Sequence, residues 1–186
     1  MATGDFIGLI NADDYLLPHA IANLILVCHE CTDVLYGNTI VNDEENKLKL
    51  VKHAGSVEGL EYSLPFIHQS SLVSKKAYEQ YGGYSEKYKI CMDYDLFARF
   101  YRGEAKFQFV NTVVSCFTYG GTSCRHTFQT IEEDISIAEK YGLSHSKAMR
   151  YKIKMYTKNS IKIVLTRLRI WKAFYCLIKR DSIYKY

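Results

Sequence analysis

Short apolar runs alternate along the chain with segments in which apolar residues recur at helical spacing. Apolar runs bounded by polar or glycine-containing turns are typical of buried strands. The sequence predicts strands at 6–10, 34–41, 48–52, 66–74 and 107–117, with a kink at Gly37. Helices are predicted at 18–27, 75–81, 93–101, 127–141 and 144–179, the last broken near 157–160. Strands that alternate with helices indicate an α/β protein.

Charge divides the chain into two parts. Residues 1–139 hold eleven Lys or Arg and nineteen Asp or Glu, whereas residues 140–186 hold thirteen basic residues and one acidic residue. This asymmetry predicts an acidic globular domain over 1–142 and a basic helical tail over 143–186. The acidic body has the wrong sign for a nucleic-acid binder, so we expect no nucleic-acid partner.

The 186 residues and the 48% hydrophobic content suit one packed domain with an appendage. No signal peptide and no run of membrane-spanning length is recognisable. Cys28 and Cys31 form a Cys-x-x-Cys pair, placed late in a predicted helix, with no second pair to complete a zinc site. We therefore expect ordinary thiols, which suit a cytoplasmic protein.

Two adjacent carboxylates, Asp13 and Asp14, follow the first predicted strand. They would lie at the carboxyl edge of the sheet, where α/β proteins bind ligands. There a carboxylate can hold Mg²⁺ or Mn²⁺ that it shares with substrate phosphates. The alternative is a solvated turn in which Asp14 caps the following helix.

Asp93 and Asp95 open a predicted helix that also contains Arg99. The helix dipole favours an ionised carboxylate at this position, which suits a base that must stay charged. The alternative is that one carboxylate caps the helix and that Asp95 pairs with Arg99 one turn later.

Two polar segments are further candidates. His68 and Gln69 begin a polar cluster that leads into a predicted strand, although a lone histidine is more often structural than functional. Gly120 and Gly121 lie in a loop after the last predicted strand, where glycine permits close approach of a ligand or simply forms a turn.

In their order and spacing these segments resemble the family-2 glycosyltransferases of GT-A type. The resemblance covers about residues 2–140, and its matching segments are 2–18, 33–38, 68–75, 81–86, 93–99 and 120–123. It implies a partial GT-A, Rossmann-like mixed sheet flanked by helices, with the basic tail as a C-terminal extension. It also implies that the family's first strand–helix units, which bind the nucleotide base, are missing, so we expect a truncated domain with weak or no independent turnover.

The resemblance implies an inverting transfer of a sugar from a nucleotide-sugar donor, such as a uridine diphosphate sugar, to a saccharide or lipid-linked acceptor. Asp93 would take the proton of the attacking acceptor hydroxyl. Asp14 would coordinate Mn²⁺ or Mg²⁺, which stabilises the departing nucleoside diphosphate. The implied substrate-binding residues are Asp13, His68, Gln69, Asp95, Arg99, Gly120 and Gly121.

The tail shows an apolar helical stripe with basic residues beside it. The stripe comprises Ile161, Val164, Leu165, Leu168, Trp171, Tyr175 and Ile178. Through residues 150–180 the tail could lie on the anionic inner face of a membrane, near a lipid-linked acceptor. The alternative is that the stripe packs on the protein's own body.

Two other hypotheses about function stay open. The chain could be a non-catalytic remnant or scaffold that binds a partner chain, or one half of a split enzyme that a separate nucleotide-binding chain completes in trans.

Overall fold

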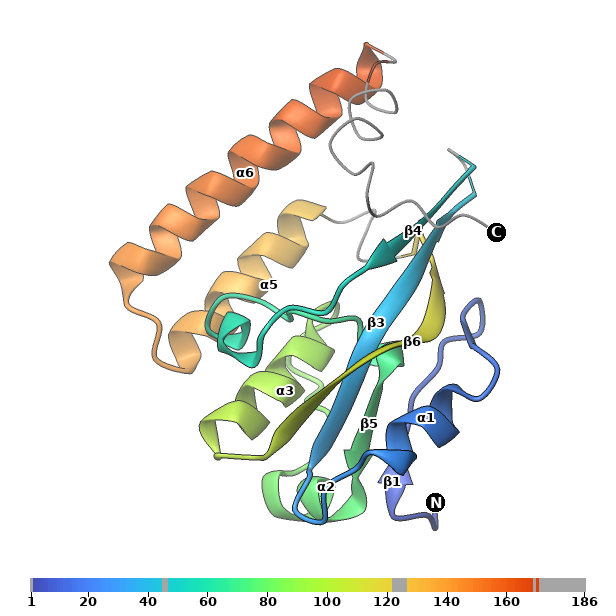
Figure 1. Cartoon of the computed structure of the whole chain (residues 1–186). Coiled ribbons are helices and arrows are strands. Elements are labelled where there is room, and N and C mark those ends of the chain that lie inside the picture. Colours follow the sequence, from blue (N-terminus) through green and yellow to red (C-terminus); the bar gives the residue numbers. More distant parts are fainter. Residues whose placement is uncertain (1, 45–46, 122–126, 169, 171–186) are drawn as a thin grey trace.

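The computed structural model describes residues 2–44, 47–121, 127–168 and 170 (Figure 1). Six strands form one mixed sheet in the order β1-β5-β3-β6-β2, and β4 pairs with β3 beside β5. Only β3 and β6 are parallel; the other pairs are antiparallel. The strands are β1 (Phe6–Ile7), β2 (Tyr15–Leu16), β3 (Val34–Asp43), β4 (Leu48–Lys52), β5 (Ser71–Ser74) and β6 (Phe107–Thr118).

Helices cover both faces of this sheet, which confirms the predicted α/β class. The α-helices are α1 (Ala20–Leu26), α2 (Lys75–Tyr81), α3 (Met92–Arg102), α5 (Thr127–Lys140) and α6 (His145–Arg167), and the 3₁₀ helices are η1 (Val57–Glu61) and η2 (His68–Ser70). α5 packs against α3, and α6 packs against α5 as a long arm at the outside of the molecule (Figure 1). No helix within the described ranges is long and apolar enough to cross a membrane.

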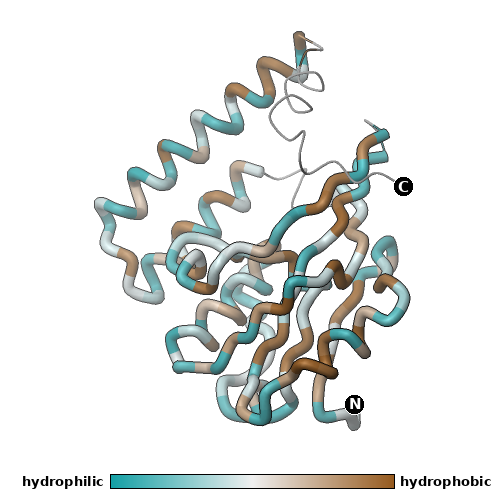
Figure 2. Tube along the Cα trace, viewed as in Figure 1, coloured by the Kyte–Doolittle hydropathy of each residue, from teal (hydrophilic) through white to brown (hydrophobic). Residues whose placement is uncertain are grey.

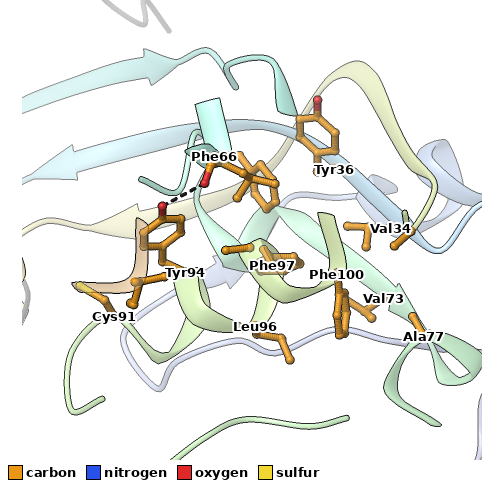
Figure 3. Packing of buried hydrophobic residues seen from close by; sticks show 14 of the residues in the cluster. Val34, Tyr36, Phe66, Val73, Ala77, Cys91, Tyr94, Leu96, Phe97 and Phe100 are labelled. Atoms are coloured by element: carbon orange, nitrogen blue, oxygen red, sulfur yellow. Dashed lines mark hydrogen bonds between the residues drawn. The ribbon is translucent and has the colours of Figure 1, made fainter. Parts of the chain in front are cut away.

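Alternation along β3 sends neighbouring side chains to opposite faces of the sheet. Val34 and Tyr36 belong to the larger core cluster, which contains the apolar side of α3, including Phe97 (Figure 3). Leu35 belongs to a second cluster with Leu24 of α1. The sheet is therefore buried on two sides, with α1 on one face and α3 on the other.

Aromatic rings join β3, the loop before η2 and α3 in the larger cluster. Tyr36 stacks on Phe66 with ring centroids 4.5 Å apart, and Phe66 meets Phe97 edge to face at 4.9 Å. The Tyr94 hydroxyl donates to the carbonyl oxygen of Leu60 at 2.9 Å (Figure 3). A buried tyrosine needs such a partner, so this bond fixes η1 over the start of α3.

Several local predictions are confirmed. α2 has the predicted bounds and ends at Gly82, whose φ of 83° is the left-handed geometry that glycine tolerates. The kink at Gly37 is a register shift in the pairing of β3 with β6. A Cβ at Gly37 would lie 2.7 Å from Val114 Cγ2 and 2.8 Å from the carbonyl oxygen of Thr112. The paired strands β3 and β6 can therefore approach this closely only at a glycine.

Other local predictions are wrong. The strand expected at 66–74 begins only at Ser71, because η2 precedes it. The strand expected at 6–10 is only two residues long in the structure. A further short strand, β2, follows Asp14; it forms because it pairs with β6, and no local sequence signal indicates this pairing. Cys28 and Cys31 lie beyond the end of α1.

The break expected at 157–160 is absent, since α6 continues through it. Asn159 donates its side-chain amide to the Met155 carbonyl at 2.9 Å, and the contacts of α6 with α5 outweigh the weak helix propensity of these residues. Of the predicted tail stripe, Trp171, Tyr175 and Ile178 lie outside the described residues.

Candidate active site

Asp14 lies just before β2 and is only 9% exposed. Its Oδ2 accepts from Gln69 Nε2 at 2.6 Å, and its Oδ1 accepts from the backbone N–H of Thr118 at 2.8 Å. The capping alternative is wrong, because α1 has His19 at its N-cap and no side-chain cap. Long-range contacts with η2 and with the end of β6 therefore fix this carboxylate.

Asp13 differs from its neighbour because its side chain is exposed. Its carbonyl oxygen accepts from Thr118 Oγ1 at 2.8 Å, so Thr118 holds both aspartates of the turn. In this turn the carboxylate of Asp13 is open to solvent, whereas that of Asp14 already accepts hydrogen bonds from the protein. Thr118 has no sequence signal for this role, since it is the last residue of an ordinary strand.

Asp93 is the second residue of α3, and its side chain is 25% exposed. Its Oδ1 accepts from the backbone N–H of Tyr94 at 2.8 Å, and its Oδ2 lies 3.1 Å from His68 Nδ1. Because the side chain is partly exposed, a substrate hydroxyl can reach it. This is the arrangement of an oriented, accessible carboxylate, which is what a general base requires.

The two carboxylates are joined by one dipeptide. His68 contacts Asp93 and the next residue, Gln69, contacts Asp14, although Asp14 and Asp93 are far apart in the sequence. The dipeptide is itself held, because Ser71 Oγ donates to the His68 carbonyl at 2.6 Å. The structure therefore brings four of the predicted site residues into one connected group.

A chain of buried hydroxyls lies under this dipeptide. Ser70 Oγ is 2.5 Å from Thr39 Oγ1 on β3 and 2.7 Å from Ser115 Oγ on β6. Sequence reasoning did not identify these residues, because each is an ordinary small polar residue until the two parallel strands meet. They anchor η2 over the centre of the sheet.

The candidate metal ligands considered at this site are oxygen atoms. The described residues contain no group of three or more His, Cys, Asp and Glu that could hold a metal ion. Gln69 Oε1 is buried without a hydrogen-bond partner, and the amide nitrogen of the same side chain donates to Asp14. The carboxylate of the neighbouring Asp13 is exposed. These oxygens fit Mg²⁺ or Mn²⁺ that is held largely by substrate oxygens and water, and not a cage built by the protein alone.

Asp95 and Arg99 make contacts of another kind. Asp95 is 1% exposed, and its Oδ1 lies 2.7 Å from Lys140 Nζ and 3.2 Å from the Tyr141 hydroxyl. Arg99 donates to the carbonyl oxygens of Tyr81 and Gly83 and lies 3.7 Å from Asp95 Oδ2. Of the earlier alternative, the Asp95–Arg99 pair is confirmed, whereas the carboxylate cap is wrong, because Cys91 is the N-cap of α3 and no side chain caps it. A role of Asp95 or Arg99 in substrate binding stays a prediction with no contact in its favour.

The segment after β6 runs past the aspartates. Gly120 has a φ of 124°, and an added Cβ would meet nothing within 4 Å at either Gly120 or Gly121. Both glycines follow Thr118, whose backbone N–H donates to Asp14, and each has open space where a side chain would be. The rest of the predicted loop, residues 122–126, lies outside the described residues.

A second carboxylate pair, Glu133 and Asp134 of α5, faces the start of α3. Glu133 Oε2 accepts from the backbone N–H groups of Ile90 and Cys91 at 3.0 and 2.9 Å. Burial raises the pKa of Asp134 to about 7, and the charges of Asp93 and Glu133 add to this rise. Sequence reasoning missed both residues, because only the packing of α5 on α3 brings them beside Asp93.

A scan against models of protein families finds no match to the chain, and a search among curated proteins finds no similar sequence. The resemblance to family-2 glycosyltransferases therefore depends on the sequence motifs alone.

Proposed function

We propose that the chain is an inverting glycosyltransferase of GT-A type, or the acceptor-side part of one. It would transfer a sugar from a nucleotide-sugar donor to a saccharide or lipid-linked acceptor. The observation that carries this proposal is the bridge formed by His68 and Gln69, which joins Asp93 at the start of α3 to Asp14 just before β2. A base and a diphosphate site must lie close together for such a transfer, and this bridge ties their candidates to one dipeptide.

Asp93 is the proposed base. Its Oδ2 is oriented by His68, and its partial exposure leaves it open to an acceptor hydroxyl. As the acceptor oxygen bonds to the anomeric carbon, Asp93 takes the hydroxyl proton and the bond from that carbon to the diphosphate oxygen breaks. Attack opposite the leaving group inverts the configuration of the sugar.

Asp13 and Asp14 are the proposed donor side of the site. A bound Mn²⁺ or Mg²⁺ would offset the negative charge of the departing nucleoside diphosphate. Thr118 and Gln69 hold Asp14 in place before any donor arrives, and this arrangement lowers the cost of ordering the site on binding.

The first test is binding of a nucleoside diphosphate, measured by calorimetry with and without Mn²⁺. We expect binding that requires the cation and that Asp13→Asn weakens, because the exposed carboxylate is lost. Glu30→Gln, which changes an exposed carboxylate in the segment between α1 and β3, is the matched control and should bind as the parent does. Absence of cation-dependent binding to uridine, guanosine, thymidine and cytidine diphosphates would contradict the proposal.

The second test is turnover. Any release of nucleoside diphosphate from a panel of nucleotide sugars should fall by about 100-fold or more in Asp93→Asn, because the general base is lost. Binding of the diphosphate should be unchanged in this variant, since Asp93 is on the acceptor side. Equal turnover by the parent and Asp93→Asn would remove Asp93 from the mechanism.

A second candidate function is association with another protein segment, as in a split enzyme or a non-catalytic module. An apolar cavity of about 240 Å³ lies between β1, β5 and α1, with Phe6, Ile21 and Leu72 among its walls. Leu26 at the end of α1 is 85% exposed nearby. A chain that self-associates or binds a partner here, and shows no cation-dependent nucleotide binding, would favour this function.

A further inference from the structure

α6 has an inner face and an outer face. Its inner face packs on the body through Ala148, Tyr151 and Met155, which join Ile131, Ile135 and Ala138 of α5 in one apolar cluster. Its outer face carries large apolar side chains that remain exposed, by 60% at Ile153, 52% at Ile161, 54% at Val164 and 61% at Leu168. These four residues are spaced by eight, three and four positions, so they share one side of the helix.

The alternative in which the tail stripe packs on the body is therefore wrong for Ile161, Val164 and Leu168. All three are exposed, and only Leu165 of the described stripe residues is half-buried. Figure 2 shows hydrophobic and hydrophilic positions alternating along the whole of α6. The helix thus has apolar residues on both sides, and the outer set has no cover from the described part of the chain.

Positive charge flanks this outer face. The helix contains no Asp or Glu, and its basic residues are Lys147, Arg150, Lys152, Lys154, Lys158, Lys162 and Arg167. Lys152 is engaged with Glu132 at 2.7 Å, whereas Lys147, Arg150, Lys154 and Lys158 are exposed. On a helical projection Arg150 lies among the apolar side chains of the outer face, and Lys147, Lys154 and Lys158 lie along one flank of it.

The combination of exposed apolar and cationic side chains indicates which class of partner fits this face. Nucleic acid offers phosphates but no apolar surface for Ile153 or Leu168. A partner helix needs a continuous apolar seam, and Thr157 interrupts this one at its centre. A bilayer surface rich in anionic lipid offers both acyl chains and negative headgroups, and lysine side chains reach such headgroups while their stems lie on apolar surface.

We propose that the outer face of α6 docks on a membrane surface that contains anionic phospholipid, with Ile153, Ile161, Val164 and Leu168 entering the headgroup boundary. This inference does not depend on the chemistry proposed above. The helix lies in the membrane plane, and its inner face keeps its contacts with α5.

Docking in this way places the candidate active site near the lipid surface. Lys162 Nζ donates to the Tyr119 hydroxyl at 2.6 Å, which joins α6 to the segment just after β6. The preceding residue, Thr118, donates its backbone N–H to Asp14. A chain held by α6 therefore carries the aspartate turn close to the bilayer, which suits a lipid-linked acceptor.

The experiment is co-sedimentation of the full chain with vesicles of phosphatidylcholine alone or mixed with phosphatidylglycerol. We expect binding only to the mixed vesicles, and weaker binding as salt rises. Lys154→Gln/Lys158→Gln should weaken binding by roughly 30-fold, because each lysine contributes electrostatic attraction to the anionic surface. Ile153→Ser/Val164→Ser should also weaken it by at least about 10-fold, because apolar area no longer enters the membrane.

Two control variants match these changes. Lys76→Gln/Lys89→Gln removes two exposed lysines elsewhere, and Leu26→Ser removes an exposed leucine of α1; both should bind as the parent does. Circular dichroism verifies that each variant is folded, and the lysine variant tests the proposal even if the apolar one unfolds. Three results would overturn the proposal: no binding to either vesicle, equal binding to both, or an equal loss of binding in the control variants. The first of these would favour a protein partner for the outer face of α6.

Discussion

At the scale of single residues, the partner of a carboxylate decides its role more than its neighbours in the sequence do. Asp13-Asp14 and Asp93-Tyr94-Asp95 look alike as acidic motifs. In the structure Asp14 is bound by Gln69 and Thr118, Asp93 is bound by His68, and Asp95 is buried against Lys140. Two of these carboxylates thus belong to one candidate site, and the third connects two helices.

Asp134 leads to a pH-dependent prediction. Its pKa rises on folding from an ordinary value of 3.8 to about 7, mainly through burial and also through the charges of Asp93 and Glu133. Between these two values the folded state holds a proton that the unfolded state has released. The stability due to this proton is present in full below pH 4 and is lost as the pH rises through about 7.

Asp134→Asn should remove this loss of stability at high pH, because asparagine does not titrate. We expect the variant to gain stability relative to the parent as the pH rises from 5 to 8, by up to about 2.5 kcal/mol. Urea unfolding at several pH values measures the gain, and Glu104→Gln, at an exposed position, is the control. Parallel curves for the parent and Asp134→Asn would show that Asp134 titrates normally in the folded chain.

At the scale of elements, β3 and β6 form the frame of the molecule. Their parallel pairing carries the hydroxyls that anchor η2, and the end of β6 binds Asp14. The frame depends on the close approach of β3 and β6 at Gly37, where an added Cβ would meet both a side chain and backbone oxygens of β6.

Gly37→Ala should therefore destabilise the chain by about 2–3 kcal/mol, because backbone atoms of β6 would have to move. The matched control is Gly83→Ala, since an added Cβ there would meet nothing within 4 Å. Chemical unfolding of both variants measures the difference. Similar stability in Gly37→Ala and Gly83→Ala would mean that the strands can separate at this point without cost.

At the scale of the whole molecule, polar contacts tie the outer helices to the sheet layers. The ion pair of Asp95 with Lys140 joins α3, which packs on the sheet, to α5, which supports the α6 arm. Because Asp95 is buried, removing its partner leaves a charge without full compensation.

Lys140→Met should lower the free energy of unfolding by about 2 kcal/mol, since Tyr141 and Arg99 compensate the charge only in part. The double variant Asp95→Asn/Lys140→Met should regain part of this loss, because the buried charge is gone. Lys76→Met, at an exposed position of α2, is the control. Unchanged stability in Lys140→Met would mean that the ion pair contributes nothing to the free energy of unfolding. A variant that stays stable but binds nucleotide more weakly would support a role of Asp95 in substrate binding.

The amino-acid sequence alone predicts the elements whose causes are local. α2, α3, β4 and most of β3, β6 and α5 lie where periodicity and glycine stops place them, because the apolar spacing and the C-cap glycines act within a few residues. The sequence also singled out Asp14, His68, Gln69 and Asp93 as candidates through their order along the chain.

Only the tertiary structure decided which of these residues meet and which side of α6 stays exposed. The bonds of Asp14 span 55 and 104 residues, and the environment of Asp134 exists only where α5 packs on α3. Such contacts depend on how the sheet orders its strands and how the helices pack, and no local pattern records that order. Burial and long-range pairing, which set charge and exposure, are properties of the folded chain.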